Sequence, residues 1–153
     1  MDAKLLRGCP LFESLRPDQL AKIASLASAR DAPAGGFLFR EGDPGDAMYV
    51  LLEGKVRISK MVEGIGEEAL AILEPGAFFG EMALIDDSPR SADALAHESC
   101  RLFVVQKTDM EDLLFVDRDL AHDVLWKLVR ILSGRLRETT DKMIFLSFAG
   151  KFE

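Results

Sequence analysis

The segment 78–92 combines residue types that could hold a small anionic ligand. Its sequence is FFGEMALIDDSPRSA. Gly80 can adopt a backbone conformation that other residues avoid, and good helix formers follow it, so we predict a tight bend that opens a single helical turn. The first turn of a helix has backbone amides without an internal partner, and these can bind an anion. The segment is therefore a candidate anion site.

Two charged residues of this segment suggest the nature of the anion. Arg90 lies between a Ser-Pro turn and a predicted strand, where its guanidinium could bind two phosphate oxygens. Glu81 would repel a purely anionic ligand, but its carboxylate could accept a hydrogen bond from a ribose 2′-OH. Phosphate and hydroxyl together indicate a nucleotide. The same residues also fit a surface salt bridge between Glu81 and Arg90, with Gly80 serving only the turn.

Helical and strand-like patterns alternate around this segment. Apolar spacing predicts a helix from about Arg16 to Ala29, with Pro17 in its first turn. After residue 107 we predict a short helix to Phe115 with Thr108 as N-cap, and then a long helix over about 118–143. Between the helices, short apolar runs cut by glycines predict strands at 37–39, 47–52, 55–61, 68–73, 91–96 and 100–105.

The layout predicts one α+β domain over residues 1–153. Several short, closely spaced strands indicate a small antiparallel β-roll or jelly-roll barrel, flanked by an N-terminal helix and a long C-terminal helix. The predicted parts are an N-terminal helical segment (9–32), the β-roll (33–107), C-terminal helices (108–143) and a tail (144–153).

The long helix has a broad apolar face. Six residues recur at heptad steps: Leu125, Val129, Leu132, Leu136, Thr139 and Met143. A second set lies beside them: Ala121, Val124, Leu128 and Ile131. Such a face could bury one side on its own barrel and the other on a second copy, which predicts a homodimer through this helix. Alternatively, the whole face packs on the barrel.

Composition narrows the class of protein. The net charge is −7 without a cluster of basic residues, so direct nucleic-acid binding is not expected. No apolar run approaches the length of a membrane span, and we expect a cytoplasmic protein. Two cysteines and two histidines supply no ligand set for a metal, and the sequence has no nucleophile–base pair. We therefore expect no metal and no enzymatic activity.

The segment 78–92 closely resembles the phosphate-binding cassette of the cyclic nucleotide-binding domain family. The run 36–54 is similar to the early strands and turns of the family, and the likeness covers about residues 9–143. It implies that Glu81 accepts the ribose 2′-OH, that the turn donates backbone amides, and that Arg90 holds the cyclic phosphate. The implied ligand-binding residues of the cassette are Phe79, Gly80, Glu81, Met82, Ala83, Arg90, Ser91 and Ala92.

The resemblance extends to the long helix. The stretch 135–142 is similar to the part of the helix that contacts adenine in activators of the family through adjacent Thr and Ser residues, which implies base contacts from Thr139 and Thr140. A hydroxyl there could read a purine edge from either subunit of a dimer. Alternatively, the threonines are polar residues that the seam, the line of heptad positions on this helix, accepts without a contact to the base. The likeness favours cAMP over cGMP as ligand and implies no other cofactor.

The predicted function is a cyclic nucleotide sensor that signals to a separate effector protein, which the sequence does not identify. Family activators carry a DNA-reading module after the long helix, whereas only ten residues follow it here, so we expect no direct DNA binding. The alternative is a structural dimerisation module with an empty pocket or another ligand. The apolar tail is either a lid or docking segment, or a terminus that packs on the barrel or on a second copy.

Overall fold

Short strands joined by tight glycine turns build the central part of the molecule. The computed structural model describes the backbone of residues 2–151 and their side chains except those of Ala83 and Lys151. Seven glycines adopt positive φ angles, which other residues rarely adopt. At Gly54 a side chain is also excluded by space, because a Cβ there would lie 2.2 Å from the carbonyl oxygen of Ser99. Tight turns of this kind let eight strands form within about 80 residues.

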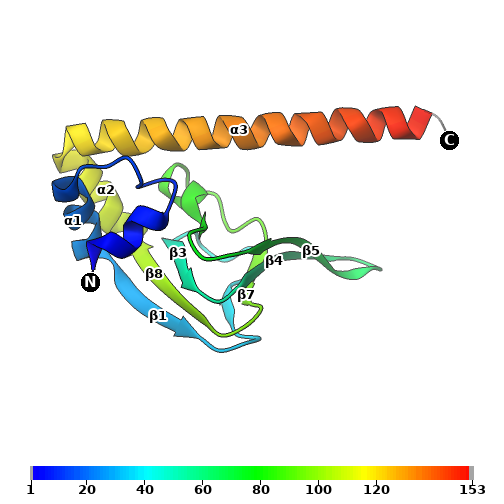
Figure 1. The fold of residues 1–153 in the computed structure, drawn as a ribbon. Helices are drawn as coiled ribbons and strands as arrows, with labels where there is room; N and C mark the ends of the chain where they lie inside the picture. Colours follow the sequence, from blue (N-terminus) through cyan, green and yellow to red (C-terminus); the bar gives the residue numbers. More distant parts are fainter. Residues whose placement is uncertain (1, 152–153) are drawn as a thin grey trace.

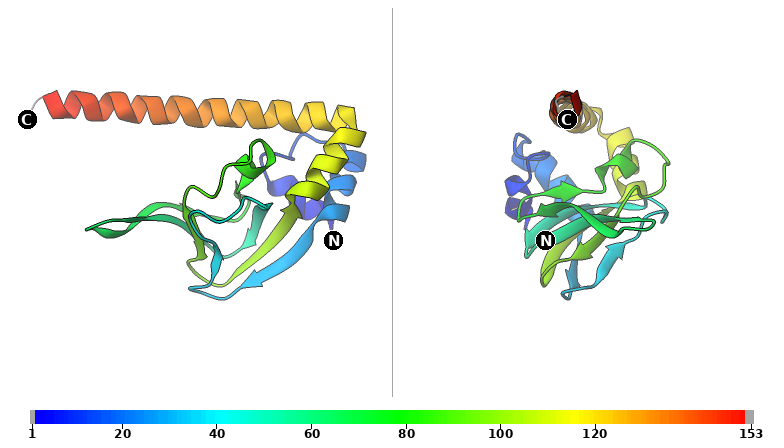
Figure 2. Two further views of the ribbon diagram at one scale, coloured as in Figure 1. Left: turned by 180° about the vertical axis from the view of Figure 1, so that it is seen from behind. Right: turned by 90° about the vertical axis from the view of Figure 1, so that its right-hand side faces the viewer.

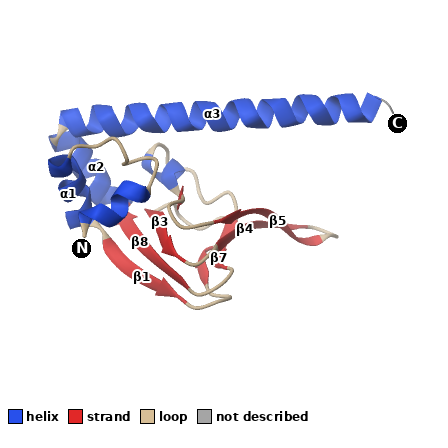
Figure 3. Cartoon of the chain, in the orientation of Figure 1, coloured by secondary structure: helices blue, strands red, loops and turns tan. Residues whose placement is uncertain are grey.

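The strands form two four-stranded antiparallel sheets that face each other (Figures 1 and 3). The first has the order β1 (Ser28–Ala32), β8 (Cys100–Gln106), β3 (Ala47–Glu53) and β6 (Phe78–Phe79). The second has the order β2 (Phe37–Phe39), β7 (Asp93–Ala96), β4 (Val56–Val62) and β5 (Gly66–Leu73). This arrangement confirms the predicted jelly-roll class with flanking helices.

The helices gather at one end of the sandwich and along one side (Figures 1 and 2). They are η1 (Ala3–Gly8), α1 (Pro17–Leu26), α2 (Lys107–Val116) and α3 (Arg118–Lys151), and the short 3₁₀ turn η2 (Glu81–Leu84) lies within the cassette. One apolar core joins the first sheet to the helices, through Phe103, Met110 and Val124 among others. A second fills the space between the sheets around Leu51, Val56 and Leu102.

The N-terminal boundary between helix and sheet was predicted wrongly. The helix ends at Leu26 instead of about Ala29, and residues 28–32, which we assigned to the helical segment, form β1. These residues are mostly exposed and do not alternate, so they carry little strand signal of their own. They are a strand because they pair with β8, from Ser28 opposite Val104 to Ala32 opposite Cys100.

Smaller differences occur at other element ends. The N-cap of α2 is Gln106 rather than Thr108, and it makes no side-chain capping bond. The strand β7 begins at Asp93 rather than residue 91, so Ser91 and Ala92 belong to the cassette loop. The two-residue strand β6 was not predicted, because its apolar pair Phe78 and Phe79 was assigned to the cassette alone.

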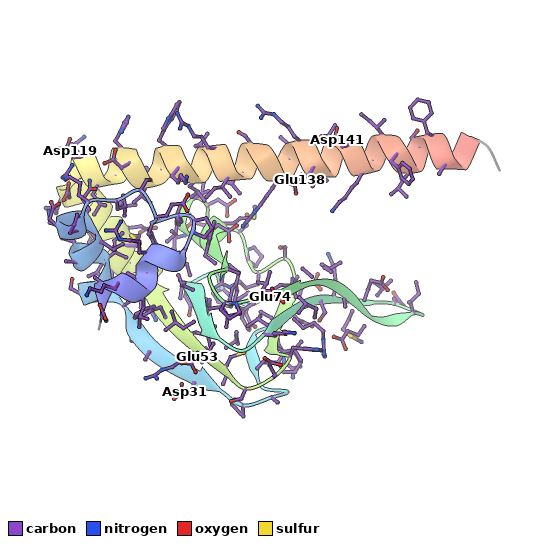
Figure 4. All side chains as sticks on the ribbon, in the orientation of Figure 1. Asp31, Glu53, Glu74, Asp119, Glu138 and Asp141 are labelled. Carbon is purple, nitrogen blue, oxygen red and sulfur yellow. The ribbon has the colours of Figure 1, made fainter. Side chains whose placement is uncertain are left out.

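The long helix continues beyond its predicted end. The predicted tail is helical through Lys151, and its last two residues lie outside the described part of the chain. At about 1.5 Å per residue α3 is about 50 Å long, and its C-terminal half extends past α1 and α2 (Figure 2). Every described side chain from 136 to 150 is exposed, including Glu138 and Asp141, which project from the helix in Figure 4. The tail therefore does not pack on the barrel.

The two sets of apolar residues on α3 have different environments. Val124 and Leu128 of the second set are buried in the helical core. Leu125, Val129, Leu136 and Met143 of the heptad set are exposed. The alternative interpretation, in which the whole apolar face of the long helix packs on the barrel, is therefore wrong. Within residues 2–151, no helix is both long and apolar enough to cross a membrane.

Candidate functional site

The cassette begins with a backbone turn that only glycine fits well. Gly80 follows β6, has a φ of 74°, and leads into η2, which confirms the predicted bend and single helical turn. A Cβ at this position would lie 2.7 Å from Nη1 of Arg90 and 3.1 Å from the carbonyl oxygen of Ala47. Glycine is thus required twice, by the left-handed backbone and by the close approach of Arg90.

Arg90 is a buried cation with incomplete compensation. Its side chain donates from Nη2 to the carbonyl oxygen of Ala47 at 2.6 Å and from Nη1 to that of Gly80 at 3.3 Å. The guanidinium also lies 4.2 Å from the ring centre of Phe39 and 3.6 Å from the exposed carboxylate of Asp46. Its Nε is buried and has no partner among the described residues. A buried guanidinium with a free donor favours an anionic ligand.

The backbone around Arg90 is fixed by pairing with the loop between β2 and β3. The amide of Arg90 donates to the carbonyl of Asp43 at 2.8 Å, and the amide of Gly42 donates to the carbonyl of Arg90 at 2.9 Å. This reciprocal pair holds the arginine in register with the loop. The cassette and the β2–β3 loop therefore form one wall of the site.

Glu81 is the second buried charge of the cassette, with 5% of its surface exposed. Its carboxylate pairs with Arg135 of α3, whose guanidinium also lies 5.0 Å from the ring centre of Phe78. The predicted alternative of a surface salt bridge between Glu81 and Arg90 is wrong, because both side chains are buried and each contacts other groups. Glu81 and Arg90 therefore belong to the same site but are held by different partners.

These charges line a cavity of about 460 Å³, a size typical of small-molecule sites. Seven of the predicted cassette residues line it: Phe79, Gly80, Glu81, Met82, Arg90, Ser91 and Ala92. The side chain of Ala83, a residue of η2, lies outside the described ones. The structure thus brings together the cassette residues predicted from the sequence.

The wall contributed by the hairpin of β4 and β5 is apolar. Ile58, Ala71 and Leu73 line it, and Phe39 and Phe78 add aromatic surface. The cavity therefore combines the buried charges of Arg90 and Glu81 with an apolar wall suited to a flat group. A phosphoribose and a base would need both kinds of surface. Sequence reasoning missed these wall residues, because they are ordinary strand positions until the hairpin folds over the cassette.

The two predicted base-contacting residues lie apart from the cavity in this single chain. Thr139 and Thr140 are exposed on α3, and Oγ1 of Thr139 donates to the carbonyl of Arg135 at 2.9 Å. The residue of α3 that lines the cavity is Arg135, which sequence reasoning missed. A signal was present, because Arg135 precedes Thr139 by four residues and so shares its helix face.

Neither cysteine is among the residues that line the cavity. Both cysteines are free and buried, and burial raises the pKa of the Cys9 thiol to about 11. Burial also raises the pKa of Cys100, so both thiols stay neutral at pH 7. In the part of the chain that the structure describes, no three His, Cys, Asp or Glu side chains converge as metal ligands would.

Comparison with known proteins agrees with this geometry. The model of the cyclic nucleotide-binding domain matches residues 29–117. The chain is 37% identical over 143 residues to the cyclic AMP receptor protein of Thermus thermophilus, covering 94% of this chain and 64% of that relative. It is 38% identical over 109 residues to the cAMP-dependent protein kinase regulatory subunit of Emericella nidulans, covering 71% and 26%.

A solved structure shares the fold over nearly its whole length. The N-terminal domain of a transcriptional regulator from Streptomyces coelicolor superposes with a TM-score of 0.78 and 35% identity, covering 91% of this chain and 94% of that one. The chain spans less than two thirds of the length of the two curated relatives. The matched part contains the cassette, both sheets and their flanking helices, and the chain belongs to the cyclic nucleotide-binding domain family.

Proposed function

We propose that this chain is a sensor module that binds a cyclic mononucleotide, with cAMP preferred over cGMP, and signals to a separate effector protein. The observation that carries the proposal is Arg90, a buried guanidinium with a free Nε at the cavity wall beside the amides of η2. Burial of an unneutralised charge is costly, so the site favours a ligand that brings a phosphate.

The cavity assigns a role to each part of the nucleotide. The cyclic phosphate would lie against Arg90, Ser91 and the start of η2, which line the cavity together. The ribose 2′-OH would donate to Glu81, which pairs with Arg135 through one carboxylate oxygen and keeps further acceptor capacity. The base would then lie against the apolar wall that includes Ile58 and Leu73.

The preference for cAMP has two supports. Both curated relatives described above are named for cyclic AMP. In addition, the stretch 135–142 resembles the adenine-contacting part of the long helix in activators of the family. We retain Thr139 and Thr140 as proposed base contacts, to be made in the assembled dimer rather than in one chain.

The proposed module is a homodimer through α3. The heptad positions Leu125, Val129, Leu136 and Met143 are 42–68% exposed, although they follow one stripe of the helix. A stripe of this kind is stabilised by packing on a second helix. The alternative function, a structural dimerisation module, would use the same stripe without a nucleotide. A binding role without catalysis is also part of the proposal, as is a cytoplasmic location, which the two free thiols support.

A calorimetric titration tests the proposal. The purified protein is stripped of nucleotide, checked by mass spectrometry, and titrated with cAMP and then with cGMP. We expect binding at micromolar concentration or tighter, with cAMP the stronger ligand. Tighter binding of cGMP would reverse the base assignment. No heat and no thermal shift with either nucleotide, from a protein shown to be folded by circular dichroism, would favour the structural module.

A further inference from the structure

Lys107 joins three segments that meet beside the ligand site without lining it. It is the first residue of α2, directly after β8, and only 15% of its side chain is exposed. Its ammonium donates to the carbonyl oxygen of Asp86 at 2.9 Å and to Oδ1 of Asp87 at 2.8 Å. Its backbone amide donates to the carbonyl oxygen of Asp46 at 2.8 Å. One residue thus contacts the cassette turn with its side chain and the β2–β3 loop with its backbone.

Both contacted segments hold groups that the site uses. Asp86 lines the cavity, and its amide donates to the carbonyl of Met82 in η2 at 3.1 Å, so its position is coupled to that turn. Asp46 precedes Ala47, whose carbonyl accepts the shorter hydrogen bond of Arg90. Arg90 donates hydrogen bonds to both sides, to Ala47 after this loop and to Gly80 before η2, so a shift between the two segments would move its guanidinium.

The charges at Lys107 are suited to a persistent contact. The hydrogen bond that the Lys107 ammonium donates to the Asp87 carboxylate raises the pKa of Lys107 and lowers the pKa of Asp87. Both groups are therefore charged at neutral pH. Glu111, one turn further along α2, lies 3.8 Å from the ammonium and adds to its negative surroundings.

We propose that Lys107 is a positioning residue, which fixes the cassette turn against the β2–β3 loop and so sets the affinity of the site for its phosphate-bearing ligand. This inference rests on the proposed function for its ligand. The hydrogen bond to the Asp86 carbonyl carries most of the effect, because the Asp87 side chain is fully exposed and its ion pair is screened by water. Lys107 itself does not line the cavity.

The contributions are separated by three substitutions and a matched control. Lys107→Met keeps the apolar stem but removes the ammonium, and we expect it to weaken cAMP binding about tenfold. Lys107→Arg keeps a charged donor and should restore most of the affinity, whereas Asp87→Asn should weaken binding less than about twofold. The control is Lys127→Met, which removes another lysine of the helical layer, paired with Glu13 at 3.1 Å and remote from the cavity.

The first readout is the Kd from calorimetry at a temperature where every variant is folded. The second is hydrogen exchange of amides 82–91 in nucleotide-free protein, which should be about tenfold faster in Lys107→Met and unchanged in the control. A purely structural role would lower the melting temperature and leave Kd and local exchange unchanged, and that result would overturn the proposal. So would a Lys107→Arg variant as weak as Lys107→Met.

The two proposals can fail separately. If the wild-type protein binds neither nucleotide, the proposed function fails. The exchange measurement uses no ligand and still decides whether Lys107 fixes the cassette turn. If the wild type binds and Lys107→Met binds equally well, only the positioning role is lost. Should Lys107→Met not fold, the Lys107→Leu variant supplies the same comparison with another side chain that cannot donate a hydrogen bond.

Discussion

The cassette and the distal half of α3, residues 136–150, differ in how far their side chains are buried within one chain. In the cassette, Glu81 and Arg90 are 5% and 7% exposed, and each contacts a group fixed by another element. In the distal half of α3 every described side chain is exposed, including Leu136 at 68% and Phe145 at 71%. The charged side chains of the first region are buried against elements of the same chain, whereas the second region presents apolar surface that a second chain could cover.

This difference means that ligand binding and assembly should be separable by mutation. The described groups that line the cavity come from the two sheets, the β2–β3 loop, the cassette and Arg135 of α3. The heptad positions exposed on α3 do not line it. A substitution in the cassette should therefore change affinity without changing assembly. A substitution in the seam should change assembly directly, and affinity only through the base contacts proposed for Thr139 and Thr140 in the dimer and through Arg135.

The largest effect is expected from Arg90→Ala, in the cassette. Loss of a charge-assisted contact to the phosphate should cost about 2–5 kcal/mol of cAMP binding. Calorimetry would measure the loss, and sedimentation would show an unchanged oligomeric state. Arg90→Lys is the matched variant, since it keeps the charge but cannot reach both carbonyls of Ala47 and Gly80. Full affinity in Arg90→Ala would remove the basis of the proposed site.

The next effect tests the exposed region. Leu136→Ala removes a seam residue from both chains of the proposed dimer and should weaken dimerisation by about 3 kcal/mol, about a hundredfold in the dimer Kd. Sedimentation equilibrium measures this change. Arg137→Ala, one position off the seam and equally exposed, should have little effect. If both variants dimerise like the wild type, the heptad stripe is not the interface. Arg137→Ala should leave cAMP affinity unchanged, whereas Leu136→Ala should lower it only by the base contacts of Thr139 and Thr140 that the dimer supplies.

The cassette was predictable from the sequence because local chemistry specifies it. Gly80 must adopt a left-handed turn, and the charged residues on either side of the Asp-Asp-Ser-Pro run have few alternative roles. Six of the eight strands were predicted with small end errors, since their apolar runs are bounded by glycine turns. The heptad stripe likewise separated from the buried set on α3.

What escaped prediction depends on partners distant in sequence. The strand β1 has polar, exposed residues and is defined by its pairing with β8, about 70 residues later. Arg135 becomes a site residue only when α3 crosses the cassette, and Lys107 acts through loops 20 and 60 residues away. Charged side chains on helices usually face water, so their sequence pattern gives no reason to assign them to a cavity.

Arg135 connects the two regions, and its substitution sharpens the comparison. In Arg135→Met the Glu81 carboxylate loses its cation beside a ligand that is itself anionic, so cAMP binding should weaken about fivefold, or about 1 kcal/mol. The effect is modest because the arginine is about half exposed. Arg130→Met, another arginine of α3 that lies near Trp126, is the control. Tighter binding in Arg135→Met would mean instead that Arg135 competes with the ribose for Glu81.

The smallest effect should be a gain. The carboxylate of Asp46 lies 3.6 Å from Nη2 of Arg90 and competes with the ligand phosphate for the same guanidinium. Because Asp46 is 75% exposed, its influence is screened, and Asp46→Asn should tighten cAMP binding about twofold, less than about 1 kcal/mol. The gain should shrink as salt rises in a calorimetric series, since exposed charges are screened more strongly. Asp31→Asn removes an exposed carboxylate near Arg101, away from the cavity, and should change nothing. Weaker binding in Asp46→Asn would mean that this carboxylate orients Arg90 for the phosphate. The buried charge of the cassette would then depend on an exposed one.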